Sequence, residues 1–316
     1  MSEFSLIREH FLWQPQPESV RVSVGDDAAV LALPANKELV VSVDTSNAGV
    51  HFPLDTPPHA IGYKALAVNL SDLAAMGAEP AWFTLALSLP AADQEWVAEF
   101  TRGMRELAEQ HGIFLIGGDT TRGALSITIQ VMGWVPPGRA LLRSGAQHGD
   151  WICVSGTLGD AAAGLAIVQQ RLVLPTVAAA FCVQRLNYPT PRVALGQCLR
   201  GLASACMDIS DGLLADLGHI LTASSGVGAR LQHTAIPVSA ALQPLALAQR
   251  LDFALRGGDD YELLFTLPKQ HLDEVQQVAN KYHIQVTVIG EVDDNQTGLS
   301  VDYTFSDKRQ GYEHFS

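Results

Sequence analysis

Aspartate residues recur where apolar stretches of the sequence, which we interpret as buried strands, run into turns. Asp is a common turn residue, so each one alone has a structural explanation. Carboxylates gathered at one half-buried place, however, raise one another's pKa unless cations neutralise them. The set comprises Asp26, Asp27, Asp44, Asp72, Asp119, Asp208, Asp211, Asp259 and Asp260. Only Asp72 falls on a predicted helix.

The ligand type indicates which cation would bind. Oxygen donors without clusters of Cys or His favour Mg²⁺ or Ca²⁺ over zinc. The sequence contains no Asp-x-Asp-x-Asn-Gly loop, which argues against a dedicated calcium site. Because Mg²⁺ usually binds one or two carboxylates together with substrate phosphates, the pattern favours magnesium-assisted phosphoryl transfer.

Two well-known phosphate-binding arrangements are excluded. The sequence has no Gly-x-x-x-x-Gly-Lys-Ser/Thr, and no lysine follows a glycine, so there is neither a P-loop nor the protein-kinase signature set. Metals and a few arginines must then neutralise the phosphates. The glycine-rich turns Gly117-Gly118 and Gly156–Gly159 could add backbone N–H donors, although such turns often have no ligand.

The bulk composition fits a folded two-domain protein. The 316 residues are 47% hydrophobic and 17% charged, which is enough for full cores. The net charge of −13 argues against a nucleic-acid or anionic-membrane partner. No apolar stretch approaches the ~18 residues of a membrane helix, and no secretory signal is evident. We interpret the four cysteines as reduced core thiols and expect a cytoplasmic protein.

Strands and helices alternate along the chain, which predicts an α/β fold of the mixed α+β type. We place a domain boundary at Pro136-Pro137-Gly138, giving domains 1–138 and 139–316. The predicted strands are 38–44, 81–88, 114–117, 126–135, 151–154, 205–208, 261–266 and 286–291. The predicted helices are 59–76, 93–111, 160–169, 191–202, 213–224 and 270–283.

Five segments together resemble the thiamine-monophosphate kinase family, and the resemblance covers essentially the whole chain. The most specific segments are the run from Lys64 to Gly77 and the motif Gly257-Gly258-Asp259-Asp260-Tyr261-Glu262-Leu263. The segments around Asp119 and Asp208–Gly212 alone indicate only the wider superfamily of aminoimidazole-ribonucleotide and selenophosphate synthetases. The remaining segment is Val24–Ala29.

The resemblance implies a fold and a reaction. Each domain would have the aminoimidazole-ribonucleotide-synthetase-like fold, with N-terminal domains pairing in a homodimer and ATP held between domains. The reaction would transfer the γ-phosphate of ATP to thiamine monophosphate, assisted by several Mg²⁺ ions. The N-terminal domain would serve metal binding, ATP binding and dimerisation.

The resemblance also assigns roles to individual positions. Metal would be held by Asp27, Ser42, Val43 (through its carbonyl), Asp44, Asp72, Asp119, Asp208 and Asp211, of which Asp72, Asp119 and Asp208 are the catalytic candidates. ATP contacts would come from Gly118, Asp119, Arg143 and Ser210. Thiamine monophosphate contacts would come from His51, Asp259 and Tyr312. Asp259 stands where the family often carries Glu, which is one methylene longer.

Several of these residues have plain structural alternatives. His51 could be a loop histidine, Tyr312 a tail aromatic covering the core, Arg143 a partner in a surface salt bridge, and Ser210 a helix cap.

Two other functions remain to be weighed. A selenophosphate synthetase usually has Cys or selenocysteine near its N-terminus, whereas the first cysteine here is Cys153, and a hydrogenase-maturation sibling would have a cysteine in its tail. A silent nucleotide or thiamine-phosphate sensor would have lost metal-binding aspartates, and every one is present.

Overall fold

The computed structural model describes residues 3–295, 298–305 and 311–312. The chain divides into two compact units, one of Met1–Leu73 with Ala78–Gly138 and the other of Ala74–Gly77 with Arg139–Ser316. No helix among the described residues is long and apolar enough to cross a membrane.

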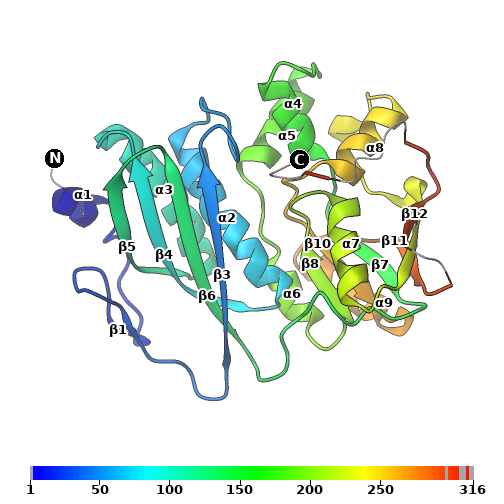
Figure 1. Cartoon of the computed structure of the whole chain (residues 1–316), viewed down its shortest axis with the longest axis horizontal. Helices are drawn as coiled ribbons and strands as arrows, with labels where there is room; N and C mark the ends of the chain where they lie inside the picture. The colour runs from blue at the N-terminus through cyan, green and yellow to red at the C-terminus, as the bar shows by residue number, and fades with distance from the viewer. Residues whose placement is uncertain (1–2, 296–297, 306–310, 313–316) are drawn as a thin grey trace. The chain divides into compact units, whose positions relative to one another are not determined.

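The first unit is built on a four-stranded sheet in the order β3-β6-β4-β5 (Figure 1). Its strands are β3 (Glu38–Asn47), β4 (Glu79–Leu89), β5 (Phe114–Arg122) and β6 (Ser126–Val135). Strands β4 and β5 run parallel, and the other pairs are antiparallel. Helices α2 (Pro58–Ala75) and α3 (Gln94–His111) cover one face of the sheet. Helix α1 (Glu3–His10) and the short strands β1 (Val20–Val22) and β2 (Val30–Leu31) complete the unit.

Sequence signals explain where α3 begins and ends. Asp93 caps the start of α3 by accepting a hydrogen bond from the Trp96 amide at 3.1 Å. Gly112 ends the helix with a φ of 62°, a left-handed conformation that favours glycine. Its C-terminal neighbour, Ile113, is fully buried, and β5 begins one residue later.

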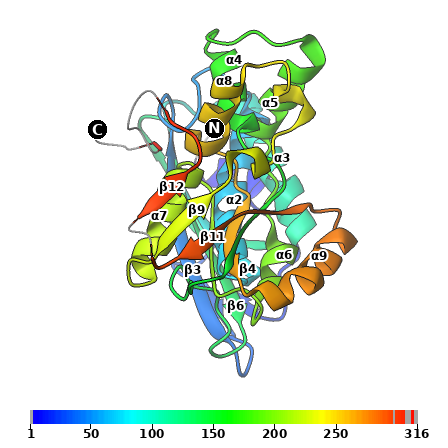
Figure 2. The same ribbon diagram turned by 90° about the vertical axis from the view of Figure 1, so that its right-hand side faces the viewer.

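The second unit has a six-stranded sheet in the order β12-β9-β11-β7-β10-β8, antiparallel except where β12 meets β9. Figure 2 labels three strands of this sheet, β12, β9 and β11. Its strands are β7 (Trp151–Ser155), β8 (Ala205–Asp208), β9 (Gly228–Leu231), β10 (Leu263–Leu267), β11 (Val286–Asp293) and β12 (Leu299–Val301). Its helices are α4 (Asp160–Val168), α5 (Thr176–Asn187), α6 (Val193–Leu199), α7 (Leu213–Ala223), α8 (Leu247–Arg256) and α9 (Leu272–Lys281). Short 3₁₀ turns lie at His233–Ala235, Ala240–Leu242 and Lys269–His271.

Helices cover both faces of this second sheet. Ile152 and Val154 of β7 pack in one buried cluster with α7 and α8, whereas Cys153 packs in another with α6 and α9. Successive side chains of a strand point to opposite faces, so β7 contributes to both cores. A strand buried on both sides has a continuous apolar sequence, which is why β7 was predicted readily.

The prediction of a mixed α/β fold is confirmed, but several strands were predicted too short, among them the two that contain Asp44 and Asp119. β3 continues past Asp44 to Asn47, and β5 continues past Asp119 to Arg122. These two aspartates therefore lie within strands, and the prediction that they follow strand ends was wrong. The continuations contain β-branched threonines and pair with neighbouring strands along their length.

Other elements were not predicted at all. Strand β9 has only four residues, which is too short for a clear periodic signal. Helix α8 did carry a signal, because Leu251, Ala254 and Leu255 have the spacing of one buried helical face.

Candidate active site

In the first unit, the fold brings Ser42 and Asp72 together. The Ser42 hydroxyl donates a 2.5 Å hydrogen bond to Oδ2 of Asp72 on α2. Asp44 lies two residues further along β3, on the same face of the sheet as Ser42. Burial raises the pKa of Asp44 above its ordinary value. Two carboxylates and a hydroxyl therefore lie on the helix-covered side of β3.

Asp119 does not join this group within the unit. The strand register places Asp44 in a row with Ile129, Leu85 and Gly118. Asp119 belongs to the next row, with Thr45, Thr128 and Ala86. Adjacent rows point to opposite faces of a sheet, and Asp119 is exposed, which agrees with the open face.

Gly118 is required by close packing of β5 against β4. A Cβ atom at this position would lie 1.9 Å from the carbonyl oxygen of Leu85, whereas one at Gly117 would meet nothing within 4 Å. Gly118 therefore lets β5 approach β4 immediately before Asp119.

Of the other predicted residues of this unit, Asp27 and His51 lie in turns, whereas Val43 lies in β3. Asp27 is exposed between β1 and β2, where its amide donates to Asp26 Oδ1 at 2.9 Å. His51 follows β3, and its Nδ1 accepts a hydrogen bond from the Asn47 amide at 3.0 Å. The neutral imidazole then has its proton on Nε2. Val43 is exposed on the open face of β3.

In the second unit, three separate segments meet at the end of β8. Asp208 ends this strand and is 5% exposed, and Ser210 and Asp211 follow in the turn before α7. The Asp259 amide donates to the Ser210 carbonyl at 2.9 Å, and the Tyr312 amide donates to the Asp211 carbonyl at 3.0 Å. The fold thus brings Asp208, Ser210, Asp211, Asp259 and Tyr312 into one cluster.

Asp216 orders the turn at the start of α7. Its Oδ2 accepts from the amides of Ser210, Asp211 and Gly212 at 3.0, 3.2 and 3.1 Å. These N–H groups at a helix start have no partner within the helix. Burial, and next the charge of Asp211, raise the pKa of Asp216 to about 7. The sequence analysis did not single out Asp216.

Arg143 is not part of this cluster. Its carbonyl and the Gly145 amide both contact the hydroxyl of Ser224, which lies at the C-terminal end of α7. Ser210 precedes the other end of that 11-residue helix, and a helix of this length spans about 16 Å.

The turn Gly156–Gly159 does not offer the free amides that the sequence suggested. The Gly156 amide donates to Gln285, the Leu158 amide to Pro237, and the Gly159 amide to both carboxylate oxygens of Asp260 at 3.0 and 2.9 Å. A carboxyl group of the protein, that of Asp260, accepts from the amide at the start of α4 that could have bound a phosphate.

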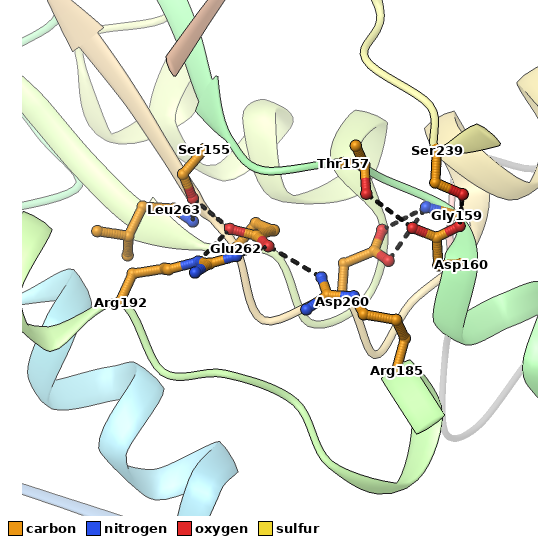
Figure 3. Close-up of polar contacts among 10 residues, drawn as sticks. All are labelled: Ser155, Thr157, Gly159, Asp160, Arg185, Arg192, Ser239, Asp260, Glu262 and Leu263. Atoms are coloured by element: carbon orange, nitrogen blue, oxygen red, sulfur yellow. Dashed lines mark hydrogen bonds and ion pairs between the residues drawn. The ribbon is translucent and has the colours of Figure 1, made fainter. Parts of the chain in front are cut away.

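A buried polar network adjoins the cluster and was also missed (Figure 3). Glu262 is fully buried and contacts Arg185, Arg192 and Ser155. Asp160 accepts hydrogen bonds from Thr157 and Ser239. The available signal was Glu262 itself, a charged residue at the start of an apolar strand.

Known families match both units. The AIR synthase related protein, N-terminal domain, matches residues 25–135, and the AIR synthase related protein, C-terminal domain, matches residues 147–302. Fold and site together define a protein of the AIR-synthase-related class.

Similar proteins and solved structures show which family of this class the chain belongs to. The chain is 47% identical to the thiamine-monophosphate kinase of Salmonella typhimurium, over 99% of this chain and 98% of that one. The crystal structure of thiamine-monophosphate kinase from Stenotrophomonas maltophilia is 48% identical, with a TM-score of 0.87 over 96% of this chain and 97% of that one. The structure of AaThiL complexed with AMPPCP and TMP is 33% identical, with a TM-score of 0.78 over 93% and 92% of the two chains. The chain belongs to the thiamine-monophosphate kinase family.

Proposed function

We propose that this protein transfers the γ-phosphate of ATP to thiamine monophosphate and so makes thiamine diphosphate. The observation that carries the proposal is full-length similarity to thiamine-monophosphate kinases, including a relative solved with AMPPCP and TMP. Carboxylates lie close together on β3 and α2 in the first unit and beside the turn before α7 in the second, which supports a phosphate-handling role.

The donor set fits Mg²⁺. Ser42, Asp44 and Asp72 offer only oxygen atoms, which are the donors that Mg²⁺ prefers. Burial disfavours the charge on Asp44, and a bound cation would restore it. Asp27, Asp119, Asp208, Asp211 and the Val43 carbonyl are the proposed ligands of further Mg²⁺ ions. When bound, Mg²⁺ lowers the repulsion between the phosphates of ATP and of the acceptor.

The acceptor needs no general base from the protein. The second pKa of a phosphate monoester is about 6, so thiamine monophosphate is largely a dianion at neutral pH. The task of the side chains is therefore to bind and orient two anions for direct in-line transfer. Gly118, Asp119, Arg143 and Ser210 are the proposed ATP contacts, and His51, Asp259 and Tyr312 the proposed thiamine monophosphate contacts.

We also propose that the N-terminal units pair in a homodimer. Leu39, Val41 and Val43 are 45%, 47% and 59% exposed along the open face of β3, the edge strand of its sheet. Exposed apolar residues that follow one edge strand are typical of a protein–protein contact. The predicted cytoplasmic location remains part of this proposal.

The direct test is to incubate the purified protein with ATP, Mg²⁺ and thiamine monophosphate. We expect stoichiometric thiamine diphosphate and ADP, and no product when EDTA is present. If ATP is hydrolysed without formation of thiamine diphosphate, the proposal is wrong. If ATP and thiamine monophosphate bind but neither reacts, the protein is a sensor.

A further inference from the structure

The loop between α8 and β10 holds two residues in an unusual backbone conformation. Asp259 has a φ of 70° and Tyr261 a φ of 49°, although neither is glycine. Left-handed backbone costs conformational free energy for such residues, so the surrounding structure must impose it. The Asp259 amide donates to Ser210, the Tyr261 amide donates to Ile209, and the Tyr261 hydroxyl contacts Asp259 Oδ1 at 3.2 Å. This conformation therefore aligns the loop with the Asp208–Asp211 turn.

Two buried carboxyl groups flank Tyr261 and anchor the loop (Figure 3). On one side, Asp260 binds the Gly159 amide at the start of α4. On the other side, Glu262 contacts Arg192 at 2.6 and 2.5 Å, Arg185 at 2.9 Å and the Ser155 hydroxyl at 2.5 Å.

The partners of Glu262 come from three different elements. Arg185 lies on α5, Arg192 immediately precedes α6, and Ser155 ends β7. Gly156 makes room for the carboxylate, because a Cβ there would lie 2.2 Å from Glu262 Oε1. Burial alone would raise the pKa of Glu262, but Arg192 and Arg185 hold it below its ordinary value. Glu262 is therefore ionised, and three elements fix its position.

We infer that Glu262, held by Arg192 and Arg185, is a positioning residue that fixes the Asp259–Tyr261 loop for recognition of thiamine monophosphate. The inference rests on the proposed function and names a residue that acts through the loop. Charged groups cost free energy to bury unless they are paired. A paired glutamate at this position fixes the loop in a way that an apolar residue could not.

Glu262→Gln tests the role by removing the charge while nearly keeping the shape. We expect the KM for thiamine monophosphate to rise at least tenfold and the KM for ATP to change less than twofold. Arg192→Lys keeps a positive charge but loses the two-point contact, so it should shift the same KM in the same direction by less. Ser239→Ala is the matched control, because it removes a partly buried hydrogen bond to Asp160 without touching Glu262.

Hydrogen exchange gives a readout that does not depend on turnover. Exchange at the amides of Asp259 and Tyr261 should quicken in the Glu262→Gln and Arg192→Lys proteins and stay unchanged in Ser239→Ala. Should Glu262→Gln not fold, Arg192→Lys decides the question. Unchanged exchange and an unchanged KM for thiamine monophosphate in a folded variant would overturn the inference. A wild-type protein that makes no thiamine diphosphate would contradict the proposed function instead, and the exchange measurement would still test the anchoring of the loop.

Discussion

The pKa values of two buried carboxyl groups, two residues apart, are shifted in opposite directions. Burial raises the pKa of Asp260 well above its ordinary value, and its partner is a neutral backbone amide. Glu262 is just as buried, but two guanidinium groups keep it ionised. Burial acts to raise both pKa values, and the charged partners of Glu262 reverse the direction of its shift.

Asp260 should make stability depend on pH. Between pH 3.8, the ordinary pKa of this side chain, and its raised folded pKa, the unfolded chain releases a proton that the folded chain retains. The free energy of unfolding should then fall as pH rises, by up to about 1.4 kcal/mol per pH unit. Asp260→Asn should flatten this slope. Urea unfolding of both proteins from pH 5 to pH 8 would check it, and parallel slopes would contradict it.

Asp72 and Asp119 should matter for turnover through their charge. Replacing either by Asn keeps the shape and removes the charge, so we expect kcat to fall at least ~10²-fold, the effect of deleting one electrostatic stabiliser. Circular dichroism should show that both variants remain folded. Near-normal turnover of both at limiting Mg²⁺ would argue against metal binding by these residues.

Single residues decide how several elements of this chain begin or pack. The turn before α7 is ordered by Asp216, from the helix itself, and the start of α4 by Asp260, from a distant loop. Strand β5 depends on a glycine for its approach to β4. At this scale, backbone contacts decide where the acidic side chains are placed.

Gly118→Ala should disturb β5, because the new methyl group would meet the Leu85 carbonyl at 1.9 Å. The strand must shift, so we expect a loss of about 1–3 kcal/mol in the free energy of unfolding, as for other overpacked sites. Gly117→Ala is the matched control, since that methyl group would meet open space. Thermal unfolding would distinguish them, and equal melting temperatures would refute the packing argument.

At the scale of the whole molecule, two surface features have proposed binding roles, the residue Tyr312 and the edge strand β3. Tyr312 is 49% exposed, which does not suit a residue that merely seals a core, and its amide contacts the Asp211 turn. Its proposed role is to stack on the cationic thiazolium ring of thiamine. The edge strand β3 is the proposed contact between two copies.

Tyr312→Ala should raise the KM for thiamine monophosphate several-fold to tens-fold, given a cation–π gain of ~0.5–2 kcal/mol. Tyr312→Phe keeps the ring and should behave like the wild type. The KM for ATP should hardly change in either variant. If both KM values stay constant while the melting temperature falls, Tyr312 has a purely structural role.

Val41→Asp should convert the proposed dimer into monomers, because it places a charge on the apolar edge of β3. Val177→Asp is the control, since Val177 is 84% exposed on α5 in the other unit. Sedimentation velocity of the wild type and both variants would show which of them are dimers. A wild-type protein that sediments as a monomer would rule out the dimer.

Local sequence alone determined the strongly patterned helices and strands, and it indicated the proposed phosphoryl-transfer reaction. Apolar runs such as that of β7 and the capped helix α3 were predictable because their signals lie within a few residues. The excess of acidic turns and the lack of a P-loop indicated magnesium-assisted phosphoryl transfer, and the motif from Gly257 to Leu263 pointed to the family.

Only the tertiary structure decided which of these residues contact one another and how burial and charged partners shift the pKa of each buried carboxyl group. Ser42 reaches Asp72 from 30 residues away, and Glu262 meets Arg192 from 70 residues away. Strand register assigned Asp44 and Asp119 to opposite faces, and Asp260 accepts from the Gly159 amide, which the sequence offered only as a possible phosphate contact. Such pairings depend on strand register and long-range packing. Residues that are close together in the sequence do not specify either one. The sequence could therefore name the acidic groups, but folding determined what each one contacts.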